Sequence, residues 1–322
     1  MVAGSVSRFC ALACALGTLF MLGHAPETAA AQENLRPTSK VQTPIRMALT
    51  FDDLPGSPIP EYGSARILAD IVQTLRAHGV RSATGFVIGE RLVSDPEAQR
   101  ALAAWTSAGF EVGNHSWSHR SLDEVGTDAY VADLVRLDAP LRTLERESGQ
   151  RARYFRYPFL EEGRSDAERR TLARTLASLG YALARVSLDF SDWGWADPYA
   201  RCLAQRDGEA LALLSKSYLA FASAGLAWSH AAAQKVLRRP LVHVLLLHAN
   251  VATAHNLDAL LTEYERAGVQ FVPLAEALED PAYTAEYDAS ISHVLTLSSL
   301  GSQRALPPHQ VRPLELLELA CR

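Results

Sequence analysis

Several features that would point to common protein classes are missing from this chain of 322 residues. Its 31 Lys and Arg residues are outnumbered by 36 Asp and Glu residues, and none of the basic residues form the concentrated patch that nucleic-acid binding requires. No Gly-rich phosphate loop follows the first predicted strand, and the sequence contains no internal repeat. These absences argue against a nucleic-acid-binding protein and against a nucleotide-binding α/β protein.

The N-terminal region lacks an apolar run long enough to span a bilayer comfortably. Residues 9–22 are apolar but short, one Arg precedes them, and residues 29–31 form an A-x-A cleavage site. We therefore expect a signal peptide at residues 1–31, export to a periplasm or beyond, and no membrane span after cleavage. An uncleaved anchor is the alternative, and a lipoprotein is disfavoured because Ala11 precedes Cys14 where Leu is expected.

Cysteine is scarce, with four residues, of which Cys10 and Cys14 fall inside the expected signal peptide. Cys202 and Cys321 remain in the mature chain, and neither has the spacing of metal ligands. In an oxidising compartment they could form a disulfide that ties the C-terminal tail to a helical region. Two unpaired thiols are the alternative, because the sequence does not give the distance between the two Cα atoms.

The whole chain is 48% apolar and 21% charged, as in an ordinary globular protein. Residues 32–45 are polar, carry two prolines and are expected to form a linker. Beyond them, short apolar runs alternate with segments of helical periodicity. The predicted strands are residues 47–51, 83–88, 110–112, 153–155, 181–188, 241–247 and 269–272. The predicted helices are residues 64–78, 96–107, 127–147, 166–179, 198–233 and 257–266.

Strands that alternate with helices predict a parallel sheet with helices outside it. Six or seven such units favour an α/β fold of the distorted (β/α) barrel type with about seven parallel strands, and an open doubly wound sheet is the alternative. We expect one domain over residues 46–279, with a helical insertion at about 198–238. Residues 280–322 lack periodicity and are expected to be a loosely attached C-terminal extension.

Polar residues follow the predicted strands at the points where the chain leaves them. In chain order they are Asp52, Asp53, His115, His119, Arg156, Asp189, Asp192, Trp193 and His248. Because the C-terminal ends of parallel strands meet at one end of a barrel, these side chains are expected to share one site. One carboxylate and two imidazoles are a common ligand set for a divalent metal, and a second carboxylate is then free to act as a general base.

Each motif also has a purely structural explanation. In a chain with 10 His residues, the spacing of His115 and His119 could arise by chance, and the acidic pair could form a turn or a helix N-cap. Arg156 could be a surface residue paired with a carboxylate, and His248 could be a core residue bonded to the backbone. Trp193 could be a core aromatic residue, although such rings also stack on the apolar faces of sugars.

Five motifs in one order along the chain favour a shared functional site over these structural explanations. They are TFDD at residues 50–53, HSWSH at 115–119, RYPF at 156–159, DFSDW at 189–193 and LLLH at 245–248. This ordered set resembles the polysaccharide deacetylases, the NodB-homology family of carbohydrate esterases (carbohydrate esterase family 4). The resemblance covers roughly residues 46–273 and implies a single catalytic domain at 46–279 that removes acetyl groups from N-acetylated glycans.

The resemblance also implies a metal centre. Asp53, His115 and His119 would hold a divalent cation, and we expect Zn²⁺ first. Co²⁺, Ni²⁺ or Mn²⁺ would also be tolerated by this ligand set, so the sequence leaves the metal open.

The two catalytic residues that the resemblance implies are a base and an acid. Asp52 would take a proton from the attacking water, and His248, in its protonated form, would give a proton to the leaving amine. Arg156 would orient Asp52, and Asp192 would orient and charge His248. Asp189 belongs to the same DFSDW motif as Asp192 and would have a supporting role in the site.

The remaining implied residues would contact the substrate. The backbone N–H of Phe159 would hold the oxyanion, and Trp193 and Leu246 would line a pocket for the acetyl methyl group. Many members of the family have Tyr at the position of Phe159, so any contact made by a Tyr hydroxyl is absent here.

Three other functions compete with this interpretation. They are a catalytically silent glycan-binding protein on the same scaffold, a small-molecule amide hydrolase of the same fold, and an iron oxygenase with two His ligands and one carboxylate. The oxygenase is disfavoured because its sites usually lie on antiparallel barrels. The sequence leaves the glycan, the choice between N- and O-deacetylation, and the oligomeric state open.

Overall fold

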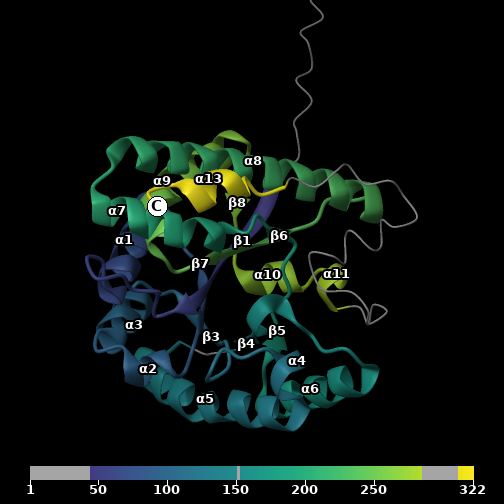
Figure 1. Cartoon of the computed structure of the whole chain (residues 1–322). Helices are drawn as coiled ribbons and strands as arrows, with labels where there is room; N and C mark the ends of the chain where they lie inside the picture. Colours follow the sequence, from purple (N-terminus) through teal and green to yellow (C-terminus); the bar gives the residue numbers. More distant parts are fainter. Residues whose placement is uncertain (1–43, 151–152, 285–310) are drawn as a thin grey trace, which may run out of the picture. The chain divides into compact units, whose positions relative to one another are not determined.

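The computed structural model describes residues 44–150, 153–284 and 311–322. The expected signal peptide, nearly all of the linker and residues 285–310 of the expected extension lie outside the described residues. Within the described part, eight strands form one parallel sheet around β1 at Ile45–Leu54 (Figure 1). The other strands are β2 (Thr84–Val87), β3 (Glu111–Asn114), β4 (Tyr154–Phe155), β5 (Ala182–Leu183), β6 (Leu188–Asp189), β7 (His243–His248) and β8 (Val269–Phe271).

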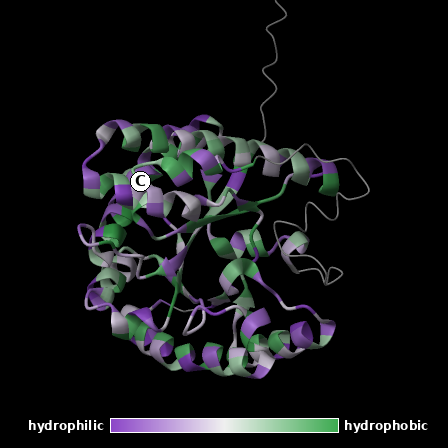
Figure 2. Cartoon of the chain, viewed as in Figure 1, coloured by the Kyte–Doolittle hydropathy of each residue, from purple (hydrophilic) through white to green (hydrophobic). Residues whose placement is uncertain are grey.

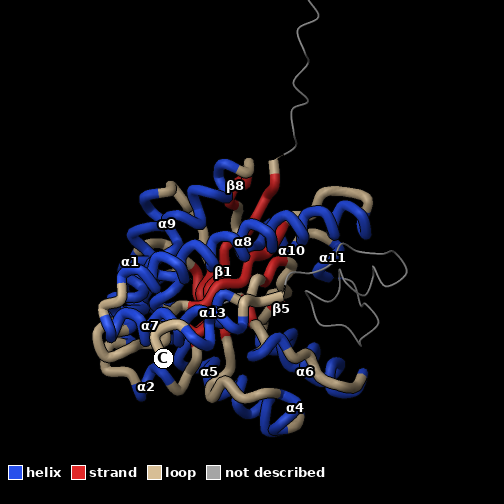
Figure 3. The backbone as a smooth tube through the Cα atoms, turned by 45° about the horizontal axis from the view of Figure 1, so that its top comes forward, coloured by secondary structure: helices blue, strands red, loops and turns tan. Residues whose placement is uncertain are grey.

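The strand order, β5-β4-β3-β2-β1-β7-β6, decides between a barrel and an open doubly wound sheet. Apart from β8, which pairs with the first residues of β1, neighbouring strands follow one another in chain order around the sheet, as in a (β/α) barrel. Among the described residues no pairing joins β5 to β6, so the barrel is open at that point. The predicted distorted (β/α) barrel is confirmed, and Figure 3 shows its strands surrounded by helices.

The opening of the barrel explains why the strand predicted at residues 181–188 is two short strands. The N–H of Ala184 donates to the carbonyl of Phe155, on the β4 side, at 2.8 Å. Three residues later the N–H of Ser187 donates to the carbonyl of Val244 on β7 at 3.1 Å. The chain changes its pairing partner between these two residues, and this change divides the strand.

Helices follow most of the strands. They are α1 (Ser64–Ala77), α2 (Arg91–Ser94), α3 (Ala98–Ser107), α4 (Leu122–Val125), α5 (Thr127–Ser148), α6 (Asp166–Leu179), α7 (Ala196–Gln205), α8 (Gly208–Leu237), α9 (Val251–Arg266), α10 (Leu274–Leu278), α11 (Pro281–Thr284) and α13 (Leu314–Leu319), with short 3₁₀ helices η1 (Pro158–Leu160) and η2 (Asp192–Trp195). Helix α6 begins at a capping box in which Ser165 and Glu168 satisfy each other's backbone N–H groups. The boundaries predicted for this helix, residues 166–179, are confirmed. The helix predicted at 257–266 begins earlier, at Val251, where the side chain of Asn250 caps it by accepting from the N–H of Thr253 at 3.0 Å.

The core lies on both sides of the central strand. Met47, Leu49 and Phe51 of β1 are at most 1% exposed, and so are their neighbours Ala48 and Thr50. A parallel strand covered on both faces has a continuous apolar sequence instead of an alternating one. Figure 2 shows the same arrangement, with apolar strands inside and polar residues on the outer faces of the helices.

The expected helical insertion is two helices, α7 and α8. Arg206 adopts a left-handed conformation with φ 56° and ends α7. The side chain of Asp207 then caps α8 by accepting from the N–H of Ala210 at 2.9 Å. By length and composition alone α8 could cross a membrane, but its Leu214 and Tyr218 are fully buried in the same core as the sheet.

Residues 311–322 are firmly attached to the domain, so the expected loose attachment is wrong for this segment. Cys202 of α7 and Cys321 form a disulfide with Cα atoms 5.1 Å apart, which answers the question that the sequence left open. A guanidinium nitrogen of Arg201 donates to the carbonyl of Leu317 at 2.9 Å. The side chain of Leu317 is 6% exposed and belongs to the main hydrophobic core.

Candidate active site

The acidic pair lies at the end of β1, and the carbonyl of Asp53 accepts from the N–H of Gly56 at 2.8 Å in the turn that follows the strand. Asp52 is 2% exposed, and Asp53 has φ 70°, in the left-handed region that costs energy for any residue with a Cβ atom. Consecutive residues of a regular strand point to opposite faces. Here both carboxylates approach His115, with Nε2 lying 3.5 Å from Asp52 Oδ2 and 3.9 Å from Asp53 Oδ1. The left-handed backbone of Asp53 thus lets two adjacent acidic side chains reach the same site.

Arg91 holds the strained backbone of Asp53 in place. One guanidinium nitrogen donates to the carbonyl oxygen of Asp53 at 2.7 Å, and the other lies 3.4 Å from its Oδ2. The first nitrogen also donates to the carbonyl of Gly56 at 3.0 Å. The sequence reasoning missed Arg91, although it follows β2 directly and the strand-end rule that selected the other residues would have selected it as well.

The two histidines lie on a tight loop after β3, one of the two arrangements that their spacing allows. Ser116 and His119 have left-handed backbones, with φ 64° and 53°. The side-chain oxygen of Asn114 accepts from the N–H of Ser116 at 2.8 Å, and the Ser116 hydroxyl accepts from the N–H of His119 at 3.2 Å. These side-chain bonds turn the loop so that both rings face Asp53.

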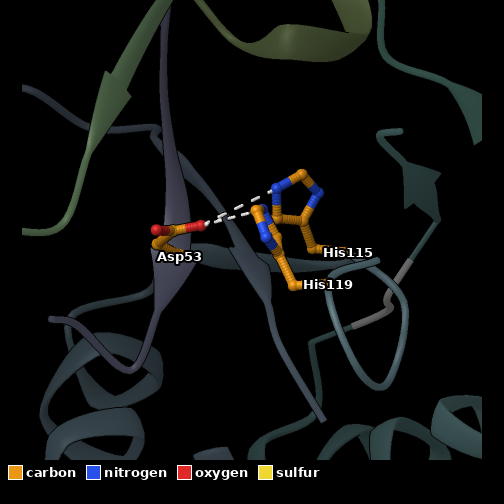
Figure 4. Close-up of side chains that lie close together, drawn as sticks. All are labelled: Asp53, His115 and His119. Carbon is orange, nitrogen blue, oxygen red and sulfur yellow. Dashed lines mark ion pairs between the residues drawn. The ribbon is translucent and has the colours of Figure 1, made fainter. Parts of the chain in front are cut away.

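Asp53, His115 and His119 form a cluster that fits a divalent cation. One potential ligand atom from each residue lies within 4.8 Å of the other two, and His119 Nε2 is 3.4 Å from Asp53 Oδ1 (Figure 4). The Nδ1–H of His115 donates to the carbonyl of Arg156 at 2.9 Å, which leaves Nε2 free to face the cluster. Asp53 Oδ1 is buried and has no hydrogen-bond donor, a costly state that a cation would relieve.

The charge states of the cluster suit metal binding, which requires deprotonated ligands. Burial, together with the neighbouring His115, lowers the pKa of His119 to about 4. Burial raises the pKa of Asp53, but the charges of His248, Arg91 and His119 outweigh it and hold that pKa below its usual value. At neutral pH the cluster therefore presents a carboxylate and a neutral imidazole from these two residues.

Asp52 is held by a buried arginine. Arg156 is 1% exposed, and its Nη1 donates to Asp52 Oδ1 at 2.7 Å and to the hydroxyl of Thr50 at 2.8 Å. Its Nε donates to the carbonyl of Ala184 at 3.0 Å, and its guanidinium lies over the ring of Phe86 at 4.2 Å. These contacts fix one oxygen of Asp52 and leave the other oxygen toward His115.

His248 lies opposite Asp52 in the pairing of β1 with β7. Its Nδ1 is 2.7 Å from Asp192 Oδ1, and the other oxygen of Asp192 accepts from the N–H of His248 at 2.8 Å and from the hydroxyl of Thr253 at 2.9 Å. Burial lowers the pKa of His248, but the charge of Asp192 and its hydrogen bond outweigh burial and raise that pKa to about 10. The site therefore contains a carboxylate and a protonated imidazole on adjacent strands.

The other predicted site residues surround this pair. Asp189 accepts from the N–H of Ser191 at 2.6 Å, which shapes the turn that leads into η2. Phe159 has φ 56°, and its ring centroid lies 4.8 Å from that of His119. Trp193 is 49% exposed, whereas Leu246 is 3% exposed and precedes His248 by two residues on β7. The structure thus brings the predicted residues to one end of the sheet, and their roles stay predictions.

The structure is an α/β barrel whose strand ends carry a candidate metal-ligand cluster, a buried carboxylate and a charged histidine. These features define the class of protein. Residues 39–184 match the family model described as polysaccharide deacetylase. Over these residues the chain matches this family, the NodB-homology proteins of carbohydrate esterase family 4. The matched region includes the metal-ligand cluster and Arg156 but ends before Asp192 and His248.

Similar proteins share parts of the chain. Peptidoglycan-N-acetylglucosamine deacetylase PgdA of Listeria monocytogenes is 25% identical over 239 residues, which are 74% of this chain and 40% of that protein. Peptidoglycan-N-acetylglucosamine deacetylase of Bacillus cereus is 30% identical over 115 residues, 36% of each chain. The chain thus spans about two fifths of the length of these relatives. A solved carbohydrate esterase family 4 pseudoenzyme from Bacillus anthracis aligns with 73% of this chain and 66% of its own, at 21% identity and a TM-score of 0.49.

Proposed function

We propose that this protein is a metal-dependent hydrolase that removes acetyl groups from N-acetylated glycans. The observation that carries the proposal is the pairing of Asp52, bound by Arg156, with the charged His248 on the next strand. Hydrolysis of an amide needs both a base and an acid, because an amine leaves poorly without a proton. The names of the Listeria and Bacillus cereus relatives support a glycan that carries N-acetylglucosamine.

Asp53, His115 and His119 would hold the cation, and Zn²⁺ is the metal that we propose. When bound, such a cation polarises a carbonyl group and lowers the pKa of a nearby water molecule. The carbonyl of Arg156 keeps the ring of His115 in the orientation that leaves Nε2 for the metal. Arg91 keeps the carboxylate of Asp53 at the same place.

Asp52 and His248 would move the protons of the reaction. Asp52 takes a proton from water through the oxygen that Arg156 leaves uncovered, and the water oxygen then bonds to the carbonyl carbon of the acetyl group. His248 donates its proton to the amide nitrogen as the carbon–nitrogen bond breaks, so the products are acetate and a free amine. Asp192 maintains the charge of His248 before this transfer.

The backbone N–H of Phe159 would donate to the oxyanion of the tetrahedral intermediate. The left-handed backbone at this residue and its ring contact with His119 support this assignment. Trp193 and Leu246 would contact the acetyl methyl group, and Asp189 would support the turn that carries Asp192. We assign this chemistry to one catalytic domain at residues 46–279.

We further propose that the protein is exported, to a periplasm or beyond, by a signal peptide at residues 1–31. The disulfide between Cys202 and Cys321 supports an oxidising compartment, since such bonds are rare in the cytosol.

The test is acetate release from N-acetylated glycan oligomers by protein that starts at Gln32. Chelator should abolish release, addition of Zn²⁺ or Co²⁺ should restore it, and Asp52→Asn should lack it in every condition. No release from any glycan by protein with one bound metal per chain would overturn the proposal. That result would favour a silent glycan-binding protein or a hydrolase of small-molecule amides.

A further inference from the structure

The C-terminal segment 311–322 reaches the 3₁₀ helix η2, whose Asp192 binds His248. Cys321 is bonded to Cys202 of α7, and the two views of the chain place α13 beside α7 (Figures 1 and 3). At the start of the segment, the guanidinium carbon of Arg312 lies 4.2 Å from the ring centroid of Trp193. Trp193 directly follows Asp192, the carboxylate bound to His248. A residue far from every family motif in the sequence therefore lies against the proposed substrate pocket.

The residues around Arg312 leave space for its side chain and fix the segment that carries it. A Cβ atom added to Gly194 would lie 3.1 Å from Arg312 Nη1, so the missing side chain at residue 194 makes room for the guanidinium. The added Cβ atom would also lie 3.7 Å from the side chain of Leu317, which anchors α13 in the core. Arg201 donates to the carbonyls of Leu317 and Ala320 and holds the end of the segment.

The charge of Arg312 is not neutralised by the protein. Its side chain is half-buried, yet within residues 44–150, 153–284 and 311–322 it forms no ion pair and no hydrogen bond, and its one specific contact is the ring of Trp193. A guanidinium is rigid, always charged and able to donate two parallel hydrogen bonds to a carboxylate. A stacked guanidinium with unused donors is prepared to bind an anionic group that comes from outside.

We propose that Arg312 is a specificity-determining residue that binds a carboxylate on the substrate, so that the preferred substrate is an N-acetylated glycan whose sugar units carry a carboxylate. This inference rests on the proposed function. Trp193 is half exposed, so a sugar can contact its ring while the guanidinium holds the acidic group.

The test compares N-acetylated chito-oligosaccharides with the same oligosaccharides oxidised at their primary hydroxyls to carboxylates. The wild-type protein should have the higher kcat/KM for the oxidised substrate, chiefly through a lower KM. In Arg312→Gln the ratio of the two kcat/KM values should fall by about ten- to a hundredfold, the usual effect of losing a hydrogen-bonded charge. Arg312→Lys should restore part of the ratio, because it keeps the charge but not the planar donor pair. An equal ratio in wild type and Arg312→Gln would overturn the inference.

Binding separates this inference from the proposed reaction. Affinities for both oligosaccharides are measured by calorimetry with the metal-loaded Asp52→Asn protein, with and without Arg312→Gln. Tighter binding of the oxidised form that depends on Arg312 would support the inference even if no glycan releases acetate. Acetate release with equal affinities would uphold the reaction and reject the role of Arg312. As a second variant, Cys321→Ser should weaken the preference as well, since it removes the covalent bond that holds the segment.

Discussion

Replacement of Asp192 by Asn should move the activity of this protein to lower pH. In the wild-type protein, the carboxylate of Asp192 is the main reason why the pKa of His248 is about 10 instead of 6.5. Asn keeps a side-chain oxygen for the His248 Nδ1–H but removes the negative charge. The pKa of His248 should therefore fall toward its ordinary value, by about 3.5 pH units.

The size of the effect follows from the protonated fraction of the proposed acid. At pH 8 about 99% of His248 is protonated when its pKa is about 10, and about 3% when its pKa is about 6.5. Activity of Asp192→Asn should therefore be about thirtyfold lower than wild type at pH 8 and recover much of this difference at pH 5.5. The assay is kcat/KM for acetate release across pH 5 to 10, with the metal content checked at each pH.

The free energy of unfolding should also depend on pH through His248. A group whose pKa is raised by folding stabilises the protein fully below its unfolded pKa, here about 6.5, and loses that contribution as the pH rises through about 10. Denaturant unfolding of the wild-type protein should therefore show a decline over this range that Asp192→Asn lacks.

Thr253→Val is the matched control. It removes the hydrogen bond from Thr253 to Asp192 Oδ2 but leaves the charge beside His248. It should lower the free energy of unfolding without moving the alkaline limb of the pH profile. If Asp192→Asn keeps the wild-type limb, or if Thr253→Val moves it equally, Asp192 does not set the charge of His248 and the assigned acid is wrong.

Three further changes test other parts of the structure. Arg156→Lys should lower kcat at least tenfold while the circular dichroism spectrum is retained, because one ammonium group cannot bond Asp52, Thr50 and Ala184 together; normal kcat would contradict this. Asp53→Ala should abolish stoichiometric metal binding in elemental analysis, so that chelator should lower the Tm of wild type but not of this variant. Cys321→Ser removes a disulfide that spans 119 positions and should lower the free energy of unfolding by up to about 5 kcal/mol in denaturant titrations. Equal stability of this variant and wild type would show that the tail unfolds independently.

Local sequence signals were sufficient where the structure depends on local interactions. The apolar run of β1 and the helical spacing of Ile67, Leu68 and Ile71 predict buried elements, and these residues are fully buried. Alternation of such elements predicted the barrel, and the position of polar residues at strand ends predicted which of them would meet. This rule predicted that Asp52, Asp53, His115 and His119 meet, because the C-terminal ends of parallel strands lie together, and the family resemblance then selected Asp53 as the ligand.

Features that depend on contacts between distant segments could not be predicted in this way. The left-handed backbone of Asp53 is unfavourable locally and persists because Arg91, 38 positions away, bonds to its carbonyl. The division of the strand after Tyr181 results from a change of pairing partner from β4 to β7. Neither effect leaves a mark in hydrophobic periodicity.

Residue chemistry and order along the chain thus determine the fold class, the candidate ligands and the candidate acid and base. Tertiary structure alone decides the charge of His248, since a pKa near 10 requires a buried carboxylate 2.7 Å away that lies 56 positions earlier in the chain. It alone also returns the last residues to the site, where a disulfide and a buried leucine place Arg312 on Trp193. Both results depend on distances between segments, which composition and spacing do not contain.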